Sequence, residues 1–505
     1  MCALSRRRIV LLVVTPVVLV ACVAVYLVVS RVLRDPIAPL YAQNCAVCHG
    51  ENLEGAAQGT PLAGRPLVRG DSVDEIERSI SEGFVATGMP AWSNTLDENQ
   101  IRGLAILISE KRAALGRIEF KTDLPLVIPE GIIASERHAF RVESVASGLH
   151  PLPFSVAPLP DGGFLLTEKV RGLSIISPDG KQSPLIVGTP PAHDDGLELL
   201  SLVYGRGWML DVALHPEYEE NGWVYLHVGD RCRDCDTSMN KLIRGRIADG
   251  RWVDEEVIWS AAPETYTEAS DMGAGGRTCF DGNGHVFLSV GIKGASDHAG
   301  VQDLSLPYGK IHRVHDDGRI PADNPFVSTA GALPSIWSYG HRSPQGLEFD
   351  PGTGRLWSTE MGPRGGDEFN LLRPGKNYGW PLTSKGVNYD GTPVAWGKEL
   401  GITFDLAEIE QPVVDLTPAP AVSSFVLYRG SAFPGWQNDA IVGTLKATEL
   451  YRFVIEGERV VHRETLLRSL ARIRDVEVGP DGYVYLLLEH ETGGRIVRLV
   501  PAGGS

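Results

Sequence analysis

The sequence has no excess of positive charge, because 47 lysines and arginines stand against 63 aspartates and glutamates and leave a formal net charge of −16. The phosphate backbone of a nucleic acid would repel such a chain, so we expect no nucleic-acid partner. Disordered chains are poor in apolar residues, and this one is not, because 43% of its residues are hydrophobic. The 57 glycines and 34 prolines indicate many turns. We therefore expect the 505 residues to form two or three turn-rich globular units.

Charged residues are missing from residues 9–30, an apolar run that follows three arginines at positions 6–8. The run is long enough to cross a hydrocarbon core of about 30 Å, and basic residues on its short N-terminal side favour a cytoplasmic N-terminus. We expect residues 1–35 to form a cytoplasmic tip and a transmembrane helix in a bacterial inner membrane, with the bulk of the chain in the periplasm. The alternative is a lipoprotein signal peptide ending before Cys22, which would also leave an exported protein at the membrane.

A second cysteine or histidine pair is missing near the CAVCH segment of residues 45–49, since the next such residue is His138. A zinc site would need that second pair, and a local disulfide is the other alternative. In an exported protein the spacing favours a c-type haem bound covalently through Cys45 and Cys48, with His49 as a ligand of the iron. Met89, between a glycine and a proline, is the expected iron ligand on the other side.

The residues around this motif have helical periodicity. We expect one helix from Pro36 to Gln43 and another after Asp97, which can cap an apolar i, i+3, i+4 pattern. Residues 36–116 resemble a class I cytochrome c, a small all-α domain. The resemblance implies His and Met ligation with no open position on the iron, and therefore a role in electron transfer.

Residues 117–138 contain prolines and a glycine without sustained periodicity, which predicts a linker. The pattern of residues 139–505 is all β, and six times an apolar strand, a turn rich in Pro, Asp, Asn and Gly, and a second apolar strand recur. This repeat predicts a six-bladed β-propeller, with a pair of β-sandwiches or another barrel as the alternative. The six segments are 157–168, 213–230, 279–291, 347–362, 432–445 and 476–490.

Residues 146–500 resemble the soluble PQQ-dependent glucose and aldose sugar dehydrogenases. The resemblance implies a six-bladed propeller with pyrroloquinoline quinone (PQQ) across its top and a sugar or alcohol as the small-molecule substrate. It is carried by Leu210 to Pro216, Gln302 to Leu304 before Gly309 to Ile311, Ile320 to Phe326, and residues 335–381.

The resemblance also implies a set of binding residues. Backbone carbonyls of Gly362 and Pro363 would hold a calcium ion beneath the cofactor, and Glu368 and Tyr378 match a second, structural calcium site. Glu368 would equally fit a solvated loop acid. Cations on converging strand ends suit the three carboxylates of PQQ, although a solvated basic face would also place two arginines two residues apart. The residues expected to bind PQQ are Arg342, Gln345, Lys446, Arg472 and Arg474.

The catalytic histidine of this family is missing. It lies four residues before the arginine of a Gly-Gly-Arg motif, a position that is Gly273 here, and Ile292 stands where its partner aspartate is expected. A positioned general base accelerates such a reaction by roughly 10² to 10⁴. Asp271 and His298 are candidate substitutes, and each also fits an ordinary surface residue. Three other positions also depart from the family's usual residues. Ser343 replaces an Asn, Met361 replaces a His or a Gln, and Arg206 replaces a Gln.

Two functions follow from these patterns. The first is a membrane-anchored quinohaemoprotein oxidoreductase that uses PQQ and calcium and passes electrons through its own haem to a respiratory acceptor; fusion would give donor and acceptor a high effective concentration. The second is an electron-transfer cytochrome fused to a catalytically degenerate propeller that binds carbohydrate or a protein partner.

The cysteines of residues 139–505 fit structural roles. We expect Cys232 and Cys235, in a charged loop, to form a local disulfide, and Cys279 to be a buried apolar residue.

Overall fold

The computed structural model describes residues 35–57, 59–115, 125–199, 202–293 and 298–502. These described residues divide into two compact units: those up to residue 114, together with 386–393, form one, and the others form the second. Among the described residues, no helix combines the length and the apolar character that a membrane span requires. The anchor expected at residues 9–30 lies outside the described part of the chain.

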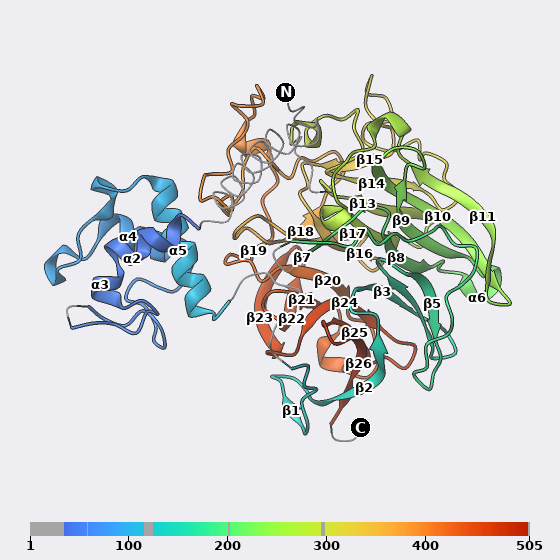
Figure 1. Ribbon diagram of the computed structural model, residues 1–505, viewed down its shortest axis with the longest axis horizontal. Coiled ribbons are helices and arrows are strands. Elements are labelled where there is room, and N and C mark those ends of the chain that lie inside the picture. Colours follow the sequence, from blue (N-terminus) through green and yellow to red (C-terminus); the bar gives the residue numbers. More distant parts are fainter. Residues whose placement is uncertain (1–34, 58, 116–124, 200–201, 294–297, 503–505) are drawn as a thin grey trace, which may run out of the picture. The chain divides into compact units, whose positions relative to one another are not determined.

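The first unit is helical (blue in Figure 1). The two helices expected from the sequence are confirmed as α2 and α5. Asp97 caps α5 by accepting a hydrogen bond from the backbone of Gln100, whose side chain bonds back to Asp97. Ile37 of α2, Ile76 of α4 and Leu104 of α5 lie in one buried core. The elements are α2 (Ile37–Asn44), α3 (Ala46–His49), α4 (Val73–Glu82), η1 (Val85–Thr87), η2 (Trp92–Asn94) and α5 (Glu98–Arg112).

The second unit is a six-bladed β-propeller, as the sequence predicts. In Figure 1 its sheets follow one another in chain order, from teal through green and yellow to red. Five of the six predicted hairpins each form the first two strands of one blade. The segment 432–445 contains only the second strand of its blade, because the first strand ends at Leu427, before the predicted segment begins. The blades are β3 (Pro153–Pro158), β4 (Phe164–Glu168), β5 (Gly172–Ile176); β8 (Met209–Leu214), β9 (Val224–Arg231), β10 (Ser238–Ala248), β11 (Arg251–Ser260); β12 (Gly275–Phe280), β13 (His285–Val290), β14 (Lys310–His315), β15 (Ile336–Tyr339); β16 (Pro344–Asp350), β17 (Arg355–Glu360), β18 (Glu368–Leu372), β19 (Val414–Asp415); β20 (Val422–Leu427), β21 (Ala440–Thr444), β22 (Leu450–Glu456), β23 (Arg459–Leu467); and β24 (Arg472–Val478), β25 (Val484–Glu489), β26 (Gly494–Pro501).

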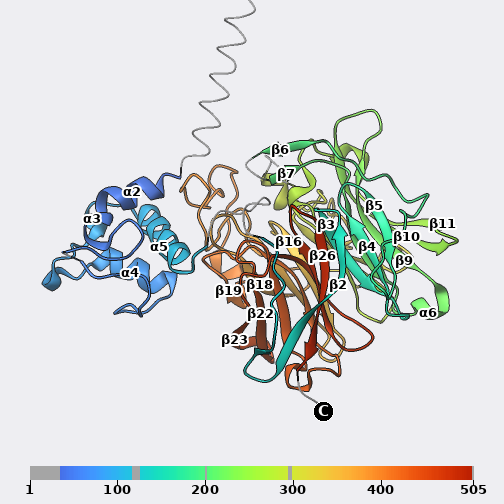
Figure 2. The same ribbon diagram turned by 60° about the horizontal axis from the view of Figure 1, so that its bottom comes forward.

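The last blade is completed by the N-terminal end of the propeller. β2 (Ala139–Leu149) pairs with β26, and Figure 2 shows the two strands side by side. β1 (Ile133–Ala134) pairs in turn with β2, so the end of the segment expected to be a linker belongs to this sheet. Glu136 adds an ion pair with Arg452. Joining the two ends of the unit in one sheet closes the ring of blades.

The remaining elements lie in the connections. They are the hairpin β6 (Leu197–Leu199) and β7 (Leu202–Tyr204), α6 (Tyr218–Asn221), η3 (Pro263–Thr265), η4 (Asp271–Gly273), η5 (Ala299–Val301), η6 (Leu406–Glu408) and η7 (Pro434–Trp436). The disulfide expected between Cys232 and Cys235 is present, and Cys279 is buried, as expected.

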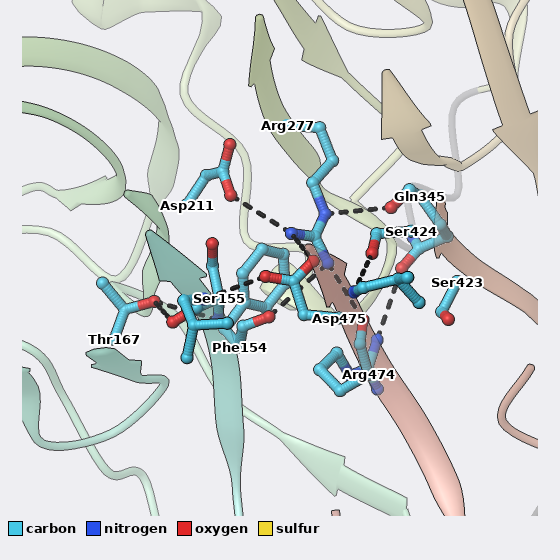
Figure 3. A network of polar contacts seen from close by, with 12 residues as sticks. Phe154, Ser155, Thr167, Asp211, Arg277, Gln345, Ser423, Ser424, Arg474 and Asp475 are labelled. Atoms are coloured by element: carbon cyan, nitrogen blue, oxygen red, sulfur yellow. Dashed lines mark hydrogen bonds and ion pairs between the residues drawn. The ribbon is translucent and has the colours of Figure 1, made fainter. Parts of the chain in front are cut away.

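The first strand of every blade faces the central channel and has an irregular register near its first residues. The extra residue at such a bulge redirects neighbouring side chains, here toward the channel. Figure 3 shows polar and aromatic residues from every blade converging there. The register shifts lie between Pro153 and Ser155, Met209 and Val212, Gly275 and Thr278, Pro344 and Gly346, Val422 and Phe425, and Ile473 and Asp475.

Candidate functional site

Arg277 ties the blades together at the start of the channel (Figure 3). Its guanidinium donates to the carboxylates of Asp211 at 3.1 Å and Asp475 at 2.8 Å. It also donates to the backbone carbonyls of Gln345 at 2.9 Å and Arg474 at 3.1 Å. Because these partners come from three other blades, Arg277 fixes the spacing of the strands whose first residues form the mouth. From the sequence, Arg277 served only to locate the position of the missing histidine, four residues before it.

A cluster of cations lies at this mouth. Arg472 donates to Glu489 at 3.0 Å, and Arg474 donates to both carboxylate oxygens of Glu489 at 2.9 and 3.0 Å. Lys169, which the sequence did not single out, lies 2.6 Å from the same carboxylate. Although burial opposes the charge of Glu489, these three cations hold its pKa well below the ordinary value.

These groups line a cavity of about 60 Å³. Gln345, an expected PQQ ligand, lies on its wall, and its amide oxygen is 3.4 Å from the Arg474 guanidinium. The structure therefore brings together three of the five residues expected to bind PQQ. The lining is Leu152, Phe154, Lys169, Val203, Trp208, Asp271, Met272, Gly275, Gln345, Arg472, Arg474 and Glu489.

Arg342 lies in a second cluster, at the glycine-rich loop after β17. Its Nη1 donates to the carbonyl oxygens of Gly362 at 2.6 Å and Met361 at 3.1 Å. The loop is held by Asp367, which accepts hydrogen bonds from the backbone of Gly362 and Val422 at 2.9 Å each. Burial raises the pKa of Asp367 to about 7, and nearby Arg342 and Lys446 oppose that shift. The Lys446 ammonium is therefore near enough to Asp367 to act on its charge.

The residues present fit an anionic, acceptor-rich ligand such as PQQ. Besides the cations, the Nε of Arg342 and the ring N–H groups of Trp208 and Trp380 are buried without a hydrogen-bond partner, and each such donor is costly to leave unpaired. Ser343, in place of the family's asparagine, accepts a hydrogen bond from Gln345 at 2.9 Å. That side chain orients Gln345, whereas an asparagine amide would itself be available to a ligand.

The carbonyl expected to bind calcium is a hard oxygen donor, which fits that ion. Here the Gly362 carbonyl bonds to a guanidinium, so a calcium ion would have to displace the Arg342 Nη1. Pro363 follows it in the same loop. The described residues contain no group of three or more His, Cys, Asp or Glu side chains arranged to hold a metal ion.

Glu368 and Tyr378, the residues of the expected second calcium site, make different contacts. Burial, followed by the Glu360 and Asp415 carboxylates on the flanking strands, raises the pKa of Glu368 to about 8. Such a crowded carboxyl would gain from a bound cation. The hydroxyl of Tyr378 lies at the other end of β18, where it donates to the Leu371 carbonyl at 2.7 Å.

The candidate substitutes for the missing base lie in different surroundings. Asp271 is buried, and its oxygens accept from the backbone of Gly207 and Trp208 at 2.8 and 2.9 Å and from the Ser238 hydroxyl at 3.0 Å. The Lys293 ammonium is 3.0 Å from the same carboxylate. Asp271 is therefore not a surface residue, and contacts within the protein occupy all of the acceptor positions of its carboxylate.

His298, the second candidate base, lies among tryptophan side chains. Its ring packs edge-on against Trp396 at 4.1 Å and Trp380 at 5.6 Å between ring centroids. The Arg342 guanidinium lies 5.3 Å from the centroid of the same Trp380 ring. His298 therefore borders the tryptophan that also borders the Arg342 cluster.

The residues expected to bind haem lie in the helical unit. Cys45 and Cys48 are not joined in a disulfide. Nδ1 of His49 lies 2.9 Å from the Thr60 carbonyl, a contact that orients the ring and leaves Nε2 for an iron ion. Met89 is held in a tight turn by backbone hydrogen bonds with Phe84 in both directions, at 2.9 and 3.3 Å.

Comparison with known proteins gives two matches to family models. Residues 150–498 match the family described as Glucose / Sorbosone dehydrogenase. Residues 34–108 match the family described as Cytochrome C oxidase, cbb3-type, subunit III.

Individual relatives cover most of the propeller. Aldose sugar dehydrogenase YliI of Escherichia coli (strain K12) is 35% identical over 354 residues, which span 69% of this chain and 90% of the relative. Quinoprotein glucose dehydrogenase B of Acinetobacter calcoaceticus is 24% identical over 452 residues, 74% of this chain and 90% of the relative. The crystal structure of the soluble aldose sugar dehydrogenase from Escherichia coli in the apo-form has a TM-score of 0.62 and 33% identity, and covers 72% of this chain and 100% of that one.

Proposed function

This chain belongs to the Glucose / Sorbosone dehydrogenase family, and from that premise we propose that it is a membrane-anchored quinohaemoprotein dehydrogenase of the periplasm. Its propeller binds PQQ and calcium and oxidises a hydroxyl group of a sugar or alcohol to a carbonyl. The electrons go to a haem c on Cys45 and Cys48 with His49 and Met89 as iron ligands, and from there to a respiratory acceptor.

One observation carries the proposal: Lys169, Arg472 and Arg474 share a single carboxylate beside a cavity at the channel mouth. A buried cluster with more cations than anions is unfavourable unless an anion binds to it. When bound, PQQ supplies a two-electron acceptor with three carboxylates, and calcium polarises its quinone carbonyl.

The residues of this chain then have separate tasks. Arg472 and Arg474 would bind carboxylates of the cofactor, and Gln345, held by Ser343, would help to hold it. The Gly362 carbonyl would hold calcium once Arg342 no longer donates to it, and the Arg342 guanidinium would then be available to the cofactor. His298 takes the hydroxyl proton, because Asp271 has no free acceptor position.

The double loss at Gly273 and Ile292 supports a second candidate function. The propeller would be catalytically degenerate and would bind carbohydrate or a protein partner, while the cytochrome domain serves another electron donor. The acid and base chemistry of the family would then be absent, but the cation cluster would remain an anion-binding site.

Reconstitution distinguishes the two. The purified, haem-loaded chain is incubated with PQQ and calcium, and haem reduction is followed by absorbance while aldoses and primary alcohols are added. We expect PQQ binding and substrate-dependent haem reduction. Binding of PQQ without haem reduction by any substrate would favour the degenerate propeller, and no binding of PQQ would contradict the dehydrogenase.

A further inference from the structure

Lys169 follows the last residue of β4 and is 6% exposed, and Glu489, at the end of β25, is 1% exposed. The Lys169 Nζ lies 2.6 Å from Glu489 Oε1, while Arg472 and Arg474 of β24 occupy the remaining positions around that carboxylate. With all four groups ionised the cluster carries two uncompensated positive charges beside the cavity at the channel mouth.

The other charged groups around Lys169 do not balance this excess. On its own hairpin Glu168 pairs with Arg171 at 3.0 Å. On η4, which borders the same cavity, Asp271 is paired with Lys293. In the loop after β2, burial lowers the pKa of the His150 imidazole, which disfavours a further positive charge there. Within the described part of the chain, Glu489 is the single carboxylate that pairs with Lys169.

Burial, followed by the charge of Arg474, lowers the pKa of Lys169 to about 7, although Glu489 opposes the shift. The two arginines cannot release a proton in this range, so the lysine is the group through which the cluster adjusts its charge at neutral pH. A bound anion next to the amine would favour its charged form.

We propose that Lys169 is a third anion-binding cation of this site, and that binding of a planar polycarboxylate by Lys169, Arg472 and Arg474 takes up one proton from solvent at the Lys169 amine. The proton converts a neutral amine into an ammonium that faces a ligand carboxylate. The inference rests on the proposed function in that PQQ is the polycarboxylate in question.

The sign of the pH dependence follows from this linkage. The pKa of Lys169 is higher in the complex than in the free protein. Below pH 7 the amine is already charged and the affinity is at its maximum. Above pH 7 the Kd rises by about tenfold per pH unit, until the pKa of the complex is passed.

Asp367, with a pKa of about 7 in the Arg342 cluster, is a second group that titrates in this window. Binding of calcium beside Asp367 would release a proton, which is opposite in sign to the proton uptake at Lys169. The variant D367N removes this contribution, and measurements at fixed saturating calcium hold it constant.

The test measures the Kd of PQQ for the full-length, haem-loaded chain by tryptophan fluorescence between pH 6 and 9, and proton uptake by calorimetry in two buffers of different ionisation enthalpy. For the wild type and D367N we expect the slope above pH 7 and an uptake approaching one proton near pH 8. K169R keeps a permanent charge, so its Kd should match the wild type at pH 6 and stay constant to pH 9. K169M should bind more weakly at pH 6 and also lose the slope.

A second probe separates this inference from the proposed function. Benzene-1,3,5-tricarboxylate is planar, polyanionic and redox-inert. If it binds with a slope that K169R abolishes while PQQ does not bind, the proton-linked anion site stands and the dehydrogenase proposal fails. If PQQ binds and K169R retains the wild-type slope, the inference is wrong and the dehydrogenase proposal is untouched. If neither probe binds at any pH, both are wrong.

Discussion

The ammonium of Lys293 lies 3.0 Å from the carboxylate of Asp271, and the two side chains are 1% and 0% exposed. The backbone N–H of Lys293 also donates to the carbonyl of Gly273 at 3.0 Å. The pair therefore lies beside Gly273 and Ile292, the two positions at which the family's base and its partner are missing. Its buried charges and complete set of hydrogen bonds are those of a structural ion pair.

Replacing one member of this pair should destabilise the propeller. D271N leaves the buried Lys293 ammonium without its counter-charge, which costs about 3–5 kcal/mol when a buried pair is broken. Urea unfolding followed by tryptophan fluorescence measures the effect. As a control, K181A removes one member of an exposed pair with Asp179 and should leave the midpoint unchanged. A D271N variant of wild-type stability that had lost only turnover would instead identify Asp271 as the base.

The substitution H298Q tests the remaining candidate base. We expect the rate of substrate-dependent haem reduction to fall by about 10² to 10⁴, with an unchanged Kd for PQQ, because a positioned base acts on the reaction and not on cofactor affinity. H462N, at an exposed histidine on β23, is the matched control and should retain full activity. An H298Q variant as fast as the wild type would exclude His298.

How much of this site the sequence could predict depends on sequence separation. Five of the six hairpins and the helix cap at Asp97 were predicted because their signals lie within a few residues of each other, and the family assignment is confirmed by the match over residues 150–498. The fifth hairpin was placed too late in the sequence, because its first strand is separated from the second by residues 428–439. The pairing of Lys169 with Glu489 joins opposite ends of the propeller sequence, and that of Arg277 with Asp475 spans four blades. No local sequence pattern predicts these ion pairs, because only closure of the ring of blades brings their members together.

The substitution M89A should leave the haem covalently attached, because both thiols and His49 remain. It should lower the reduction potential, since the thioether ligand that favours the reduced iron is lost. Potentiometry and the pyridine haemochrome spectrum measure the two properties. C48A, in contrast, should impair covalent attachment. An unchanged potential in M89A would show that another residue ligates the iron.

Removing Arg342 should change calcium and PQQ affinity in opposite directions. In R342A the Gly362 carbonyl no longer bonds to a guanidinium, so calcium should bind the cofactor-free protein more tightly. PQQ should bind more weakly, because a cation and the unpaired Nε donor are lost. Calorimetric titrations with calcium alone, and with PQQ at saturating calcium, give both values. Parallel weakening of both would mean that Arg342 supports the loop and does not compete for its carbonyl.

Glu348 gives the propeller a predictable pH dependence of stability. It lines a channel cavity of about 230 Å³ together with Asp211, Asp475 and Glu477, and burial, followed by the Asp475 and Asp211 charges, raises its pKa from 4.5 to about 8. Between these values the folded state binds more protons than the unfolded state, so the stability from this group is full below pH 4.5 and is lost as the pH rises through 8.

The variant E348Q keeps the shape of this side chain and removes its titration. Its free energy of unfolding should fall less between pH 5 and pH 9 than that of the wild type, and it should be the more stable of the two at pH 9. Glu477, whose pKa is also raised by burial and by the neighbouring carboxylates, should keep a remnant of the slope. Urea midpoints at the two pH values, with E219Q at an exposed site as control, provide the measurement. Equal slopes for wild type and E348Q would mean that Glu348 is ionised in the folded channel at neutral pH.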